Sequence, residues 1–214
     1  MTNYYPIFLA IKGRPCVVIG GGKVAERKII QLLHAGANVT TISPSITKNI
    51  QLMVESGKVE WVNRQYKKGD LYGAFLAIAA TNNRRVNLRV SIEATKCKTI
   101  LNVIDDTPLC SFIAPSIINK GDVTVAISTG GTSPALARKL RHLLDNSPQL
   151  EYACLSQIMG QARKLISKKQ ISVSPNHWQK CITQDLLDLV KSGNQQQALD
   201  ILMERLISQG SPIV

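Results

Sequence analysis

The chain has 214 residues, 44% of them hydrophobic, which is enough for one α/β domain with a smaller helical part beside it. No apolar run approaches the length of a membrane span, and no basic N-terminus leads into an apolar stretch, so we expect a cytoplasmic protein without a membrane partner. Lys and Arg outnumber Asp and Glu by 26 to 14, and residues 1–150 hold 19 of the basic but only 9 of the acidic residues.

This positive charge predicts a polyanionic partner, either a nucleic acid or a small ligand with several carboxylates or phosphates. Aromatic residues make up 5% of the chain, and no basic run is interleaved with aromatics, as binding to single strands would need. We therefore expect an acidic small molecule and no nucleic acid. The five cysteines form no C-x-x-C pair and the three histidines are dispersed, so we expect neither a metal site nor a disulfide framework.

The first predicted strand, residues 15–19, runs through a glycine turn directly into a helix. The spacing Gly20-x-Gly22-x-x-Ala25 is the dinucleotide-binding fingerprint with alanine in the third place. Gly20 would take the tight turn, Gly22 would let a pyrophosphate approach the backbone, and Ala25 would let the helix pack closely on the strand. The N–H groups that start the helix would face the phosphates. The alternative is a purely structural turn.

A helix that closes at Gly36 and a strand over residues 38–43 complete a β-α-β unit. The acidic residue that usually binds the adenosine ribose is missing, because this strand ends at Ile42-Ser43-Pro44. Ser43 or nearby backbone is the candidate for that contact. No arginine stands there to bind a 2′-phosphate, which favours NAD over NADP.

Further elements are predicted in chain order: a helix over 47–56, strands over 59–64 and 75–81, a helix over 84–95 and a strand over 99–104. The buried strand ends at Thr81-Asn82, and the last one delivers Asp105 and Asp106 to the same carboxyl edge, where open α/β sheets bind ligands. A carboxylate beside a nicotinamide could accept a proton or fix a substrate N–H. The stretch from Asp105 to Pro108 could equally be an ordinary turn.

After residue 110, runs over 111–118 and 123–128 predict an antiparallel hairpin, whose open edges a partner subunit would cover. Thr132 or Ser133 would then cap a helix, and the preceding pair Gly130-Gly131, with Arg138 on the helix behind it, is a second candidate anion site. The alternative is an ordinary capped helix. Helices over 150–167, 176–191 and 195–208 complete the chain.

We therefore predict an α/β fold with a Rossmann-type parallel sheet, followed by a small hairpin and helix segment for dimerisation and an α-helical C-terminal region. The predicted boundaries are 1–111 for the NAD-binding domain, 112–147 for the dimerisation segment and 148–214 for the helical domain.

Several segments together resemble the precorrin-2 dehydrogenase family, which includes the N-terminal dehydrogenase and ferrochelatase module of siroheme synthases. The similarity runs in order from about residue 5 to residue 146. The matching motifs are Pro6-Ile7-Phe8, Val18-Ile19-Gly20-Gly21-Gly22-Lys23-Val24-Ala25-Glu26-Arg27-Lys28, Ala79-Ala80-Thr81-Asn82-Asn83, Val86-Asn87, Asn102-Val103-Ile104-Asp105-Asp106, Ser111-Phe112-Ile113-Ala114-Pro115-Ser116 and Ser128-Thr129-Gly130-Gly131-Thr132-Ser133-Pro134-Ala135-Leu136-Ala137-Arg138.

The resemblance implies NAD-dependent oxidation of precorrin-2 to sirohydrochlorin, and it leaves open whether ferrous iron is a further substrate that is inserted to give siroheme. The many carboxylates of precorrin-2 agree with the basic charge of the chain. Asp105 matches the family's catalytic aspartate, as general base or as the group that orients the pyrrole nitrogens. The family forms homodimers through the segment after the Rossmann domain.

The predicted cofactor-binding residues are Gly20, Gly22, Lys23, Val24, Ser43, Pro44, Thr81, Asn82 and Val103, and the predicted substrate-binding residues are Ser128, Gly130, Gly131, Thr132, Ser133 and Arg138. A rival hypothesis is an NAD-sensing regulatory module without catalysis. Two features depart from the family. The first is that Pro108 stands one place later than the usual proline after the aspartates. The second is length, because 214 residues leave no room for the methyltransferase domain of fused siroheme synthases, and we therefore expect methylation to be done by another protein.

Overall fold

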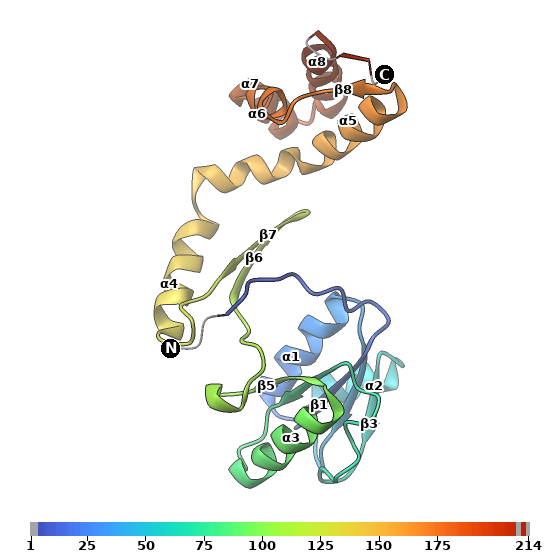
Figure 1. Cartoon of the computed structure of the whole chain (residues 1–214), viewed down its shortest axis with the longest axis vertical. Helices are drawn as coiled ribbons and strands as arrows, with labels where there is room; N and C mark the ends of the chain where they lie inside the picture. Colours follow the sequence, from blue (N-terminus) through green and yellow to red (C-terminus); the bar gives the residue numbers. More distant parts are fainter. Residues whose placement is uncertain (1–3, 209–210, 213–214) are drawn as a thin grey trace. The chain divides into compact units, whose positions relative to one another are not determined.

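The structure is a computed structural model and describes residues 4–208 and 211–212. It divides into two units, Met1–Ala114 and Pro115–Val214, which are described separately below (Figure 1). The finer division of the second unit into a dimerisation segment and a helical domain stays a prediction.

The first unit is built on a sheet of five parallel strands, as predicted, in the order β3-β2-β1-β4-β5. The strands are β1 (Pro15–Ile19), β2 (Asn38–Ile42), β3 (Val59–Val62), β4 (Leu76–Ala79) and β5 (Ile100–Val103). In the register of the sheet, Val18 of β1 lies between Thr41 of β2 and Ile78 of β4. The chain therefore reverses its direction of winding between β1 and β4, and open α/β sheets bind ligands in the crevice at such a switch point.

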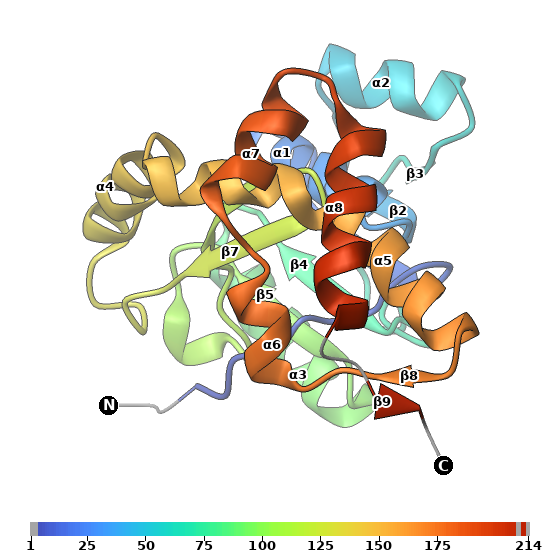
Figure 2. The ribbon, with the colours of Figure 1, turned by 90° about the horizontal axis from the view of Figure 1, so that it is seen from above.

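Helices cover both faces of this sheet, with α1 (Lys23–His34) and α2 (Lys48–Glu55) on one face and α3 (Arg84–Cys97) on the other (Figure 2). Alternate side chains of each strand enter the two core layers, because side chains in a strand point to opposite faces in turn. In β1, Val18 packs with the α1 layer and Val17 and Ile19 with the α3 layer. All four residues of β4 are buried, as its continuous apolar sequence predicted.

The second unit begins with the predicted antiparallel hairpin, β6 (Ser116–Lys120) and β7 (Val123–Ile127), in which Ser116 pairs with Ile127. The first strand starts at Ser116 and not at residue 111, because the backbone N–H groups of Ser111 and Phe112 are bonded to Leu101 of β5. The helix α4 (Pro134–Asp145) follows, and the Ser133 side chain caps it by accepting a hydrogen bond from the Leu136 N–H, as predicted.

The C-terminal helices differ from the prediction in two places. The first turns, η2 (Pro148–Leu155), are a 3₁₀ helix that continues as α5 (Ser156–Lys168). The helix expected over 176–191 is two helices, α6 (Pro175–Lys180) and α7 (Gln184–Lys191). Thr183 between them has extended backbone, and its hydroxyl accepts a hydrogen bond from Arg205, so a tertiary contact interrupts the helical pattern.

The last helix, α8 (Gln195–Ser208), has the predicted bounds and packs with α5 and α7 around a second core (Figures 1 and 2). Two short strands, β8 (Ile171–Ser172) and β9 (Ser211–Pro212), pair antiparallel beside it. In the part of the chain that the structure describes, no helix has the length and apolar character of a membrane span.

Candidate functional site

The glycine turn between β1 and α1 contains two positions where a side chain cannot fit. Gly20 has a φ of 123°, and a Cβ there would lie 2.4 Å from the Ala80 carbonyl oxygen at the end of β4. A Cβ on Gly21 would lie 2.0 Å from the carbonyl oxygen of Ser45. Such distances are far inside van der Waals contact, so the backbone of β4 and of the loop after β2 both require glycine here.

Gly22 has the opposite environment, because an ideal Cβ there meets nothing within 4 Å. It precedes α1 as its N-cap, with no side chain capping the helix, and the first intrahelical bond joins the Glu26 N–H to its carbonyl oxygen at 2.9 Å. The N–H groups of the first turn thus have no partner within the helix. Open space in front of free N–H groups and a positive helix end fits a pyrophosphate, and Ala25 behind it is fully buried, as the fingerprint predicts.

The loop after β2 is fastened to this corner by Glu26, a residue that the sequence reasoning missed. Its carboxylate accepts hydrogen bonds from the Thr47 hydroxyl and, at 2.8 Å, from the Asn49 amide, while the Thr47 N–H donates to the Gly21 carbonyl oxygen at 3.0 Å. The Thr47 hydrogen bond is the main reason that the pKa of Glu26 is lowered from its ordinary value. No sequence pattern marks this contact, because the partners lie on two different helices.

At the end of β2, the predicted ribose contact Ser43 is buried. Its hydroxyl donates to the Ser45 carbonyl oxygen at 2.7 Å, and its own carbonyl oxygen accepts from the Trp61 indole N–H at 2.9 Å. Pro44 and Ser45, in contrast, are exposed. The Ser43 hydroxyl is thus engaged within its own loop.

At the end of β4, Thr81 and Asn87 bond to each other reciprocally. The Thr81 hydroxyl donates to the Asn87 side-chain oxygen at 2.7 Å, and the Asn87 amide donates to the Thr81 carbonyl oxygen at 3.1 Å. The Asn83 side chain caps α3, which leaves Asn82 exposed in a hollow lined by residues 81–85. At this strand end Asn82 is thus exposed, while Thr81 and Asn87 are bonded to each other.

The two aspartates after β5 have different surroundings. Asp106 lies 3.5 Å from the Arg84 guanidinium and is 19% exposed, whereas Asp105 is exposed. Within the described residues, no hydrogen bond or ion pair to the Asp105 carboxylate is found. Asp105 has a φ of 59°, an uncommon backbone conformation for a residue with a side chain. The neighbouring strands β1, β4 and β5 thus bring the glycine turn, Asn82 and Asp105 to one edge of the sheet.

Val103, a predicted cofactor contact, is 2% exposed, and its side chain packs in the α3 core layer. Its N–H and carbonyl oxygen lie 3.1 Å and 3.2 Å from the Cys110 thiol. Cys110 follows a short 3₁₀ helix, η1 (Thr107–Leu109), and sequence reasoning gave it no role.

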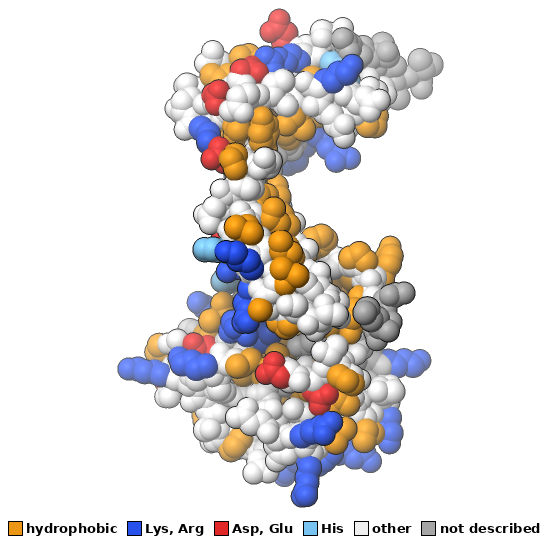
Figure 3. Space-filling model, turned by 90° about the vertical axis from the view of Figure 1, so that its left-hand side faces the viewer, with side chains coloured by type: hydrophobic (Ala, Val, Ile, Leu, Met, Phe, Trp, Pro, Cys, Tyr) orange, Lys and Arg blue, Asp and Glu red, His pale blue; other side chains and the backbone are white. Residues whose placement is uncertain are grey.

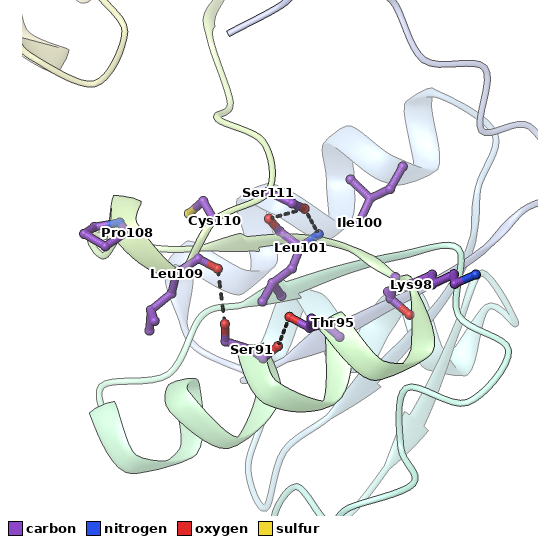
Figure 4. Close-up of a pocket in the computed structure, with 11 residues that line it drawn as sticks. Ser91, Thr95, Lys98, Ile100, Leu101, Pro108, Leu109, Cys110 and Ser111 are labelled. Carbon is purple, nitrogen blue, oxygen red and sulfur yellow. Dashed lines mark hydrogen bonds between the residues drawn. The ribbon is translucent and has the colours of Figure 1, made fainter. Parts of the chain in front are cut away.

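A pocket lies on the outer side of β5, between α3 and the segment that contains Cys110 (Figure 4). The Ser91 hydroxyl spans it by donating to the Leu109 carbonyl oxygen at 3.5 Å. No predicted site residue lines this pocket. Among residues 4–208 and 211–212, no group of three or more His, Cys, Asp or Glu side chains could hold a metal ion.

The predicted substrate-binding residues lie in the second unit, in the loop between β7 and α4. Gly130 and Gly131 both have positive φ, of 63° and 88°, and the Gly130 N–H donates to the Ser128 hydroxyl at 3.1 Å. The Ser133 N–H donates to the Thr129 hydroxyl at 3.0 Å, and Thr132 and Arg138 are exposed. The loop therefore gathers five of the six predicted residues, and Arg138 lies on the helix that follows.

The strand order, the glycine turn and the open N-terminus of α1 define a dinucleotide-binding protein of the Rossmann type. Comparison with known proteins agrees. The family model described as "Putative NAD(P)-binding" matches residues 7–116, and the one described as "Sirohaem biosynthesis protein central" matches residues 120–147.

Among relatives, a siroheme synthase from Actinobacillus pleuropneumoniae serotype 3 is 33% identical over 99% of this chain and 44% of its own length. One from Photobacterium profundum is 39% identical over 92% of this chain and 42% of its own. The chain thus spans less than half the length of these relatives. A solved structure, "SirC, precorrin-2 dehydrogenase", is 26% identical with a TM-score of 0.75, over 94% of this chain and 100% of that one. The chain belongs to the NAD(P)-binding family that precorrin-2 dehydrogenases share with siroheme synthases.

Proposed function

We propose that the protein oxidises precorrin-2 to sirohydrochlorin with NAD as the hydride acceptor. The observation that carries this proposal is the position of Asp105, an exposed carboxylate at the same sheet edge as the glycine turn. The relationship to siroheme synthases and to a precorrin-2 dehydrogenase supports the substrate class. The excess of Lys and Arg in residues 1–150 suits a substrate with many carboxylates.

In the first unit, we assign cofactor binding to the N-terminus of α1 and proton transfer to Asp105. The open N-terminus of α1 at Gly22 binds the pyrophosphate of NAD, which when bound supplies the acceptor for the hydride. An Asp105 carboxylate oxygen takes the proton that leaves the macrocycle as the hydride is transferred. Asp106 is held by Arg84 and keeps its charge paired, so we assign it to the shape of the turn and not to the proton transfer.

The test is turnover of Asp105→Asn, followed under anaerobic conditions by the absorbance of NADH and sirohydrochlorin. We expect the variant to bind NAD like the wild type and to lose about 10²- to 10⁴-fold in kcat, which is the usual contribution of a general base. Asp106→Asn is the control, with a smaller loss. Wild-type-like turnover of Asp105→Asn would remove this residue from the mechanism. A wild type that binds NAD but does not oxidise precorrin-2 would support the regulatory module instead.

The same assay addresses ferrous iron as a second substrate. Siroheme formation faster than the spontaneous rate, after ferrous iron is added to the sirohydrochlorin product, is the result expected of a chelatase. Loss of this activity in Asp105→Asn would assign both steps to one carboxylate.

The loop over residues 128–133 and Arg138 are proposed to bind carboxylate arms of the substrate. Arg138→Ala should raise KM for precorrin-2 and leave the Kd for NAD unchanged, since the residue lies in the unit that lacks the glycine turn. Lys139→Ala, at the next position of α4, is the matched control. Equal effects of the two substitutions would indicate a general charge effect without a specific contact.

We also propose that the protein is a homodimer and that a second copy covers α4. Leu136, Leu140 and Leu143 recur at helical spacing and are 49%, 37% and 55% exposed. Figure 3, which looks onto α4, shows hydrophobic side chains along the helix beside Lys and Arg side chains.

Leu143→Asp should lower the mass measured by light scattering from that of a dimer to that of a monomer. Leu88→Asp, at an exposed leucine of α3, should not change it.

A further inference from the structure

The outer edge of β5 is closed by two side chains where a further strand would normally pair. β5 is an edge strand. The N–H of its first residue, Ile100, donates to Phe75 just before β4, and that of Ile104, just after β5, donates to Ala79 of β4. The backbone groups of Leu101 and Val103 therefore face outward. Unpaired groups of this kind at a sheet edge need a partner.

Ser111 and Cys110 supply these partners. The Leu101 N–H donates to the Ser111 hydroxyl at 2.7 Å, and that hydroxyl lies 3.2 Å from the Leu101 carbonyl oxygen (Figure 4). The Val103 N–H donates to the Cys110 thiol at 3.1 Å, and the thiol lies 3.2 Å from the Val103 carbonyl oxygen. The Leu101 carbonyl oxygen also accepts the Ser111 backbone N–H at 2.8 Å, whereas the partner of the outward Val103 groups is the Cys110 thiol.

The two partners differ in what else they hold. The Cys110 thiol also lies 3.5 Å from the Asp106 carbonyl oxygen, so it contacts the first and the last residue of the turn that contains Asp105. The bond that closes the turn itself is long, at 3.4 Å from the Asp106 N–H to the Val103 carbonyl oxygen. Asp106 is also contacted from outside the turn by the Leu109 N–H, at 3.1 Å from its carbonyl oxygen, and by the Arg84 guanidinium. Asp105 itself stands at a φ of 59°, a conformation that surrounding contacts must maintain. Ser111 makes no hydrogen bond to this turn among the described residues.

We propose that Cys110 is a positioning residue, which acts through its contacts with Val103 and Asp106 to hold the Asp105 carboxylate where the proton is transferred. This rests on the proposed function. Displacing a catalytic group by about 1 Å costs about 100-fold in rate, which sets the size of the effect expected from a positioning residue. The thiol remains neutral in this role, since burial is the main factor that raises its pKa.

The test compares Cys110→Ala, Cys110→Ser and Ser111→Ala in the full chain. For Cys110→Ala we expect kcat to fall about 10- to 100-fold, with KM for precorrin-2 and Kd for NAD within about threefold of the wild type. Cys110→Ser keeps a donor and an acceptor and should restore most of the kcat. Ser111→Ala removes the side-chain contacts with Leu101, and leaves the Ser111 backbone bond and the Asp105 turn untouched, so its kcat should stay near that of the wild type.

Hydrogen exchange of backbone amides gives a readout that does not need the substrate. Exchange at Val103 and Asp106 should be faster in Cys110→Ala, and exchange at Leu101 faster in Ser111→Ala. A kcat within twofold of the wild type in Cys110→Ala, or equal kcat losses in Cys110→Ala and Ser111→Ala, would overturn the proposal. If Cys110→Ala does not fold, a kcat for Cys110→Ser as low as for Asp105→Asn would overturn it. Full activity of Asp105→Asn would instead refute the proposed function while leaving the exchange result intact.

Discussion

The glycine turn after β1 and the Asp105 turn after β5 lie at the same edge of one sheet, and they are held in different ways. In the glycine turn, backbone from β4 and from the loop after β2 comes so close that no Cβ fits at Gly20 or Gly21. In the Asp105 turn, a residue with a side chain adopts positive φ, and the side chains of Cys110 and Arg84 contact the turn from outside. The first turn depends on side chains being absent, and the second on side chains being present.

This difference explains why the glycine turn could be predicted from the sequence with more certainty than the Asp105 turn. A position that requires glycine forms part of a local sequence motif, so the fingerprint at Gly20 and Gly22 predicted both the turn and its open face. The contacts that hold this turn join Cys110 to Val103 and Asp106, and Arg84 to Asp106, and their spacing follows no local pattern. From the sequence alone, Asp105 to Pro108 could therefore be assigned as a site or as a plain turn.

The largest effect should come from adding a single methyl group to the glycine turn. Gly20→Ala should lower the free energy of unfolding of the first unit by about 3 kcal/mol or more, because its Cβ would collide with backbone and its φ is unfavourable. Gly22→Ala, with open space around it, should leave stability within about 0.5 kcal/mol and weaken NAD binding. Urea unfolding and calorimetric titration with NAD measure the two effects. Equal loss of stability in both variants would contradict the contrast.

An intermediate effect is expected at the Asp105 turn, where the backbone conformation and the carboxylate can be separated. Asp105→Gly and Asp105→Ala both lack the carboxylate, but only alanine has a Cβ, which makes a positive φ energetically unfavourable. We expect Asp105→Ala to be about 1 kcal/mol less stable than Asp105→Gly, with turnover lost in both. Denaturant unfolding followed by circular dichroism is the measurement. The same stability for both variants would show that the turn is not strained.

The smallest effect concerns the Glu26 contact that fastens the loop after β2 to the glycine turn. Because its pKa is lowered from 4.5 in the folded state, the ionised carboxylate stabilises the fold above that pH, and this contribution is lost as the pH falls through the lower folded value. Glu26→Gln should therefore flatten the pH dependence of thermal stability below about pH 4.5. Glu55→Gln, an exposed carboxylate on α2, should leave the profile unchanged.

The order of strands and helices in the first unit could be predicted from the sequence because each element has its own apolar periodicity. The predicted and observed bounds of the elements differ by only a few residues. The strand predicted over 75–81, for example, ends at Ala79 as β4, and the Thr81 side chain beyond it bonds to Asn87. Failures occur where a tertiary contact decides. The break at Thr183 depends on Arg205, and the inward-turned hydroxyl of Ser43 depends on its bond to the Ser45 backbone.

The side chains at the outer edge of β5 have a further consequence for the sheet as a whole. An open edge can recruit a strand from the same chain or from a neighbouring molecule, and such recruitment leads to aggregation. With Leu101 and Val103 already bonded to Ser111 and Cys110, this edge offers no ladder to an incoming strand. The Cys110 and Ser111 side chains, together with the Ser111 backbone N–H, thus take up the outward groups of Leu101 and Val103 on β5, the last strand of the sheet.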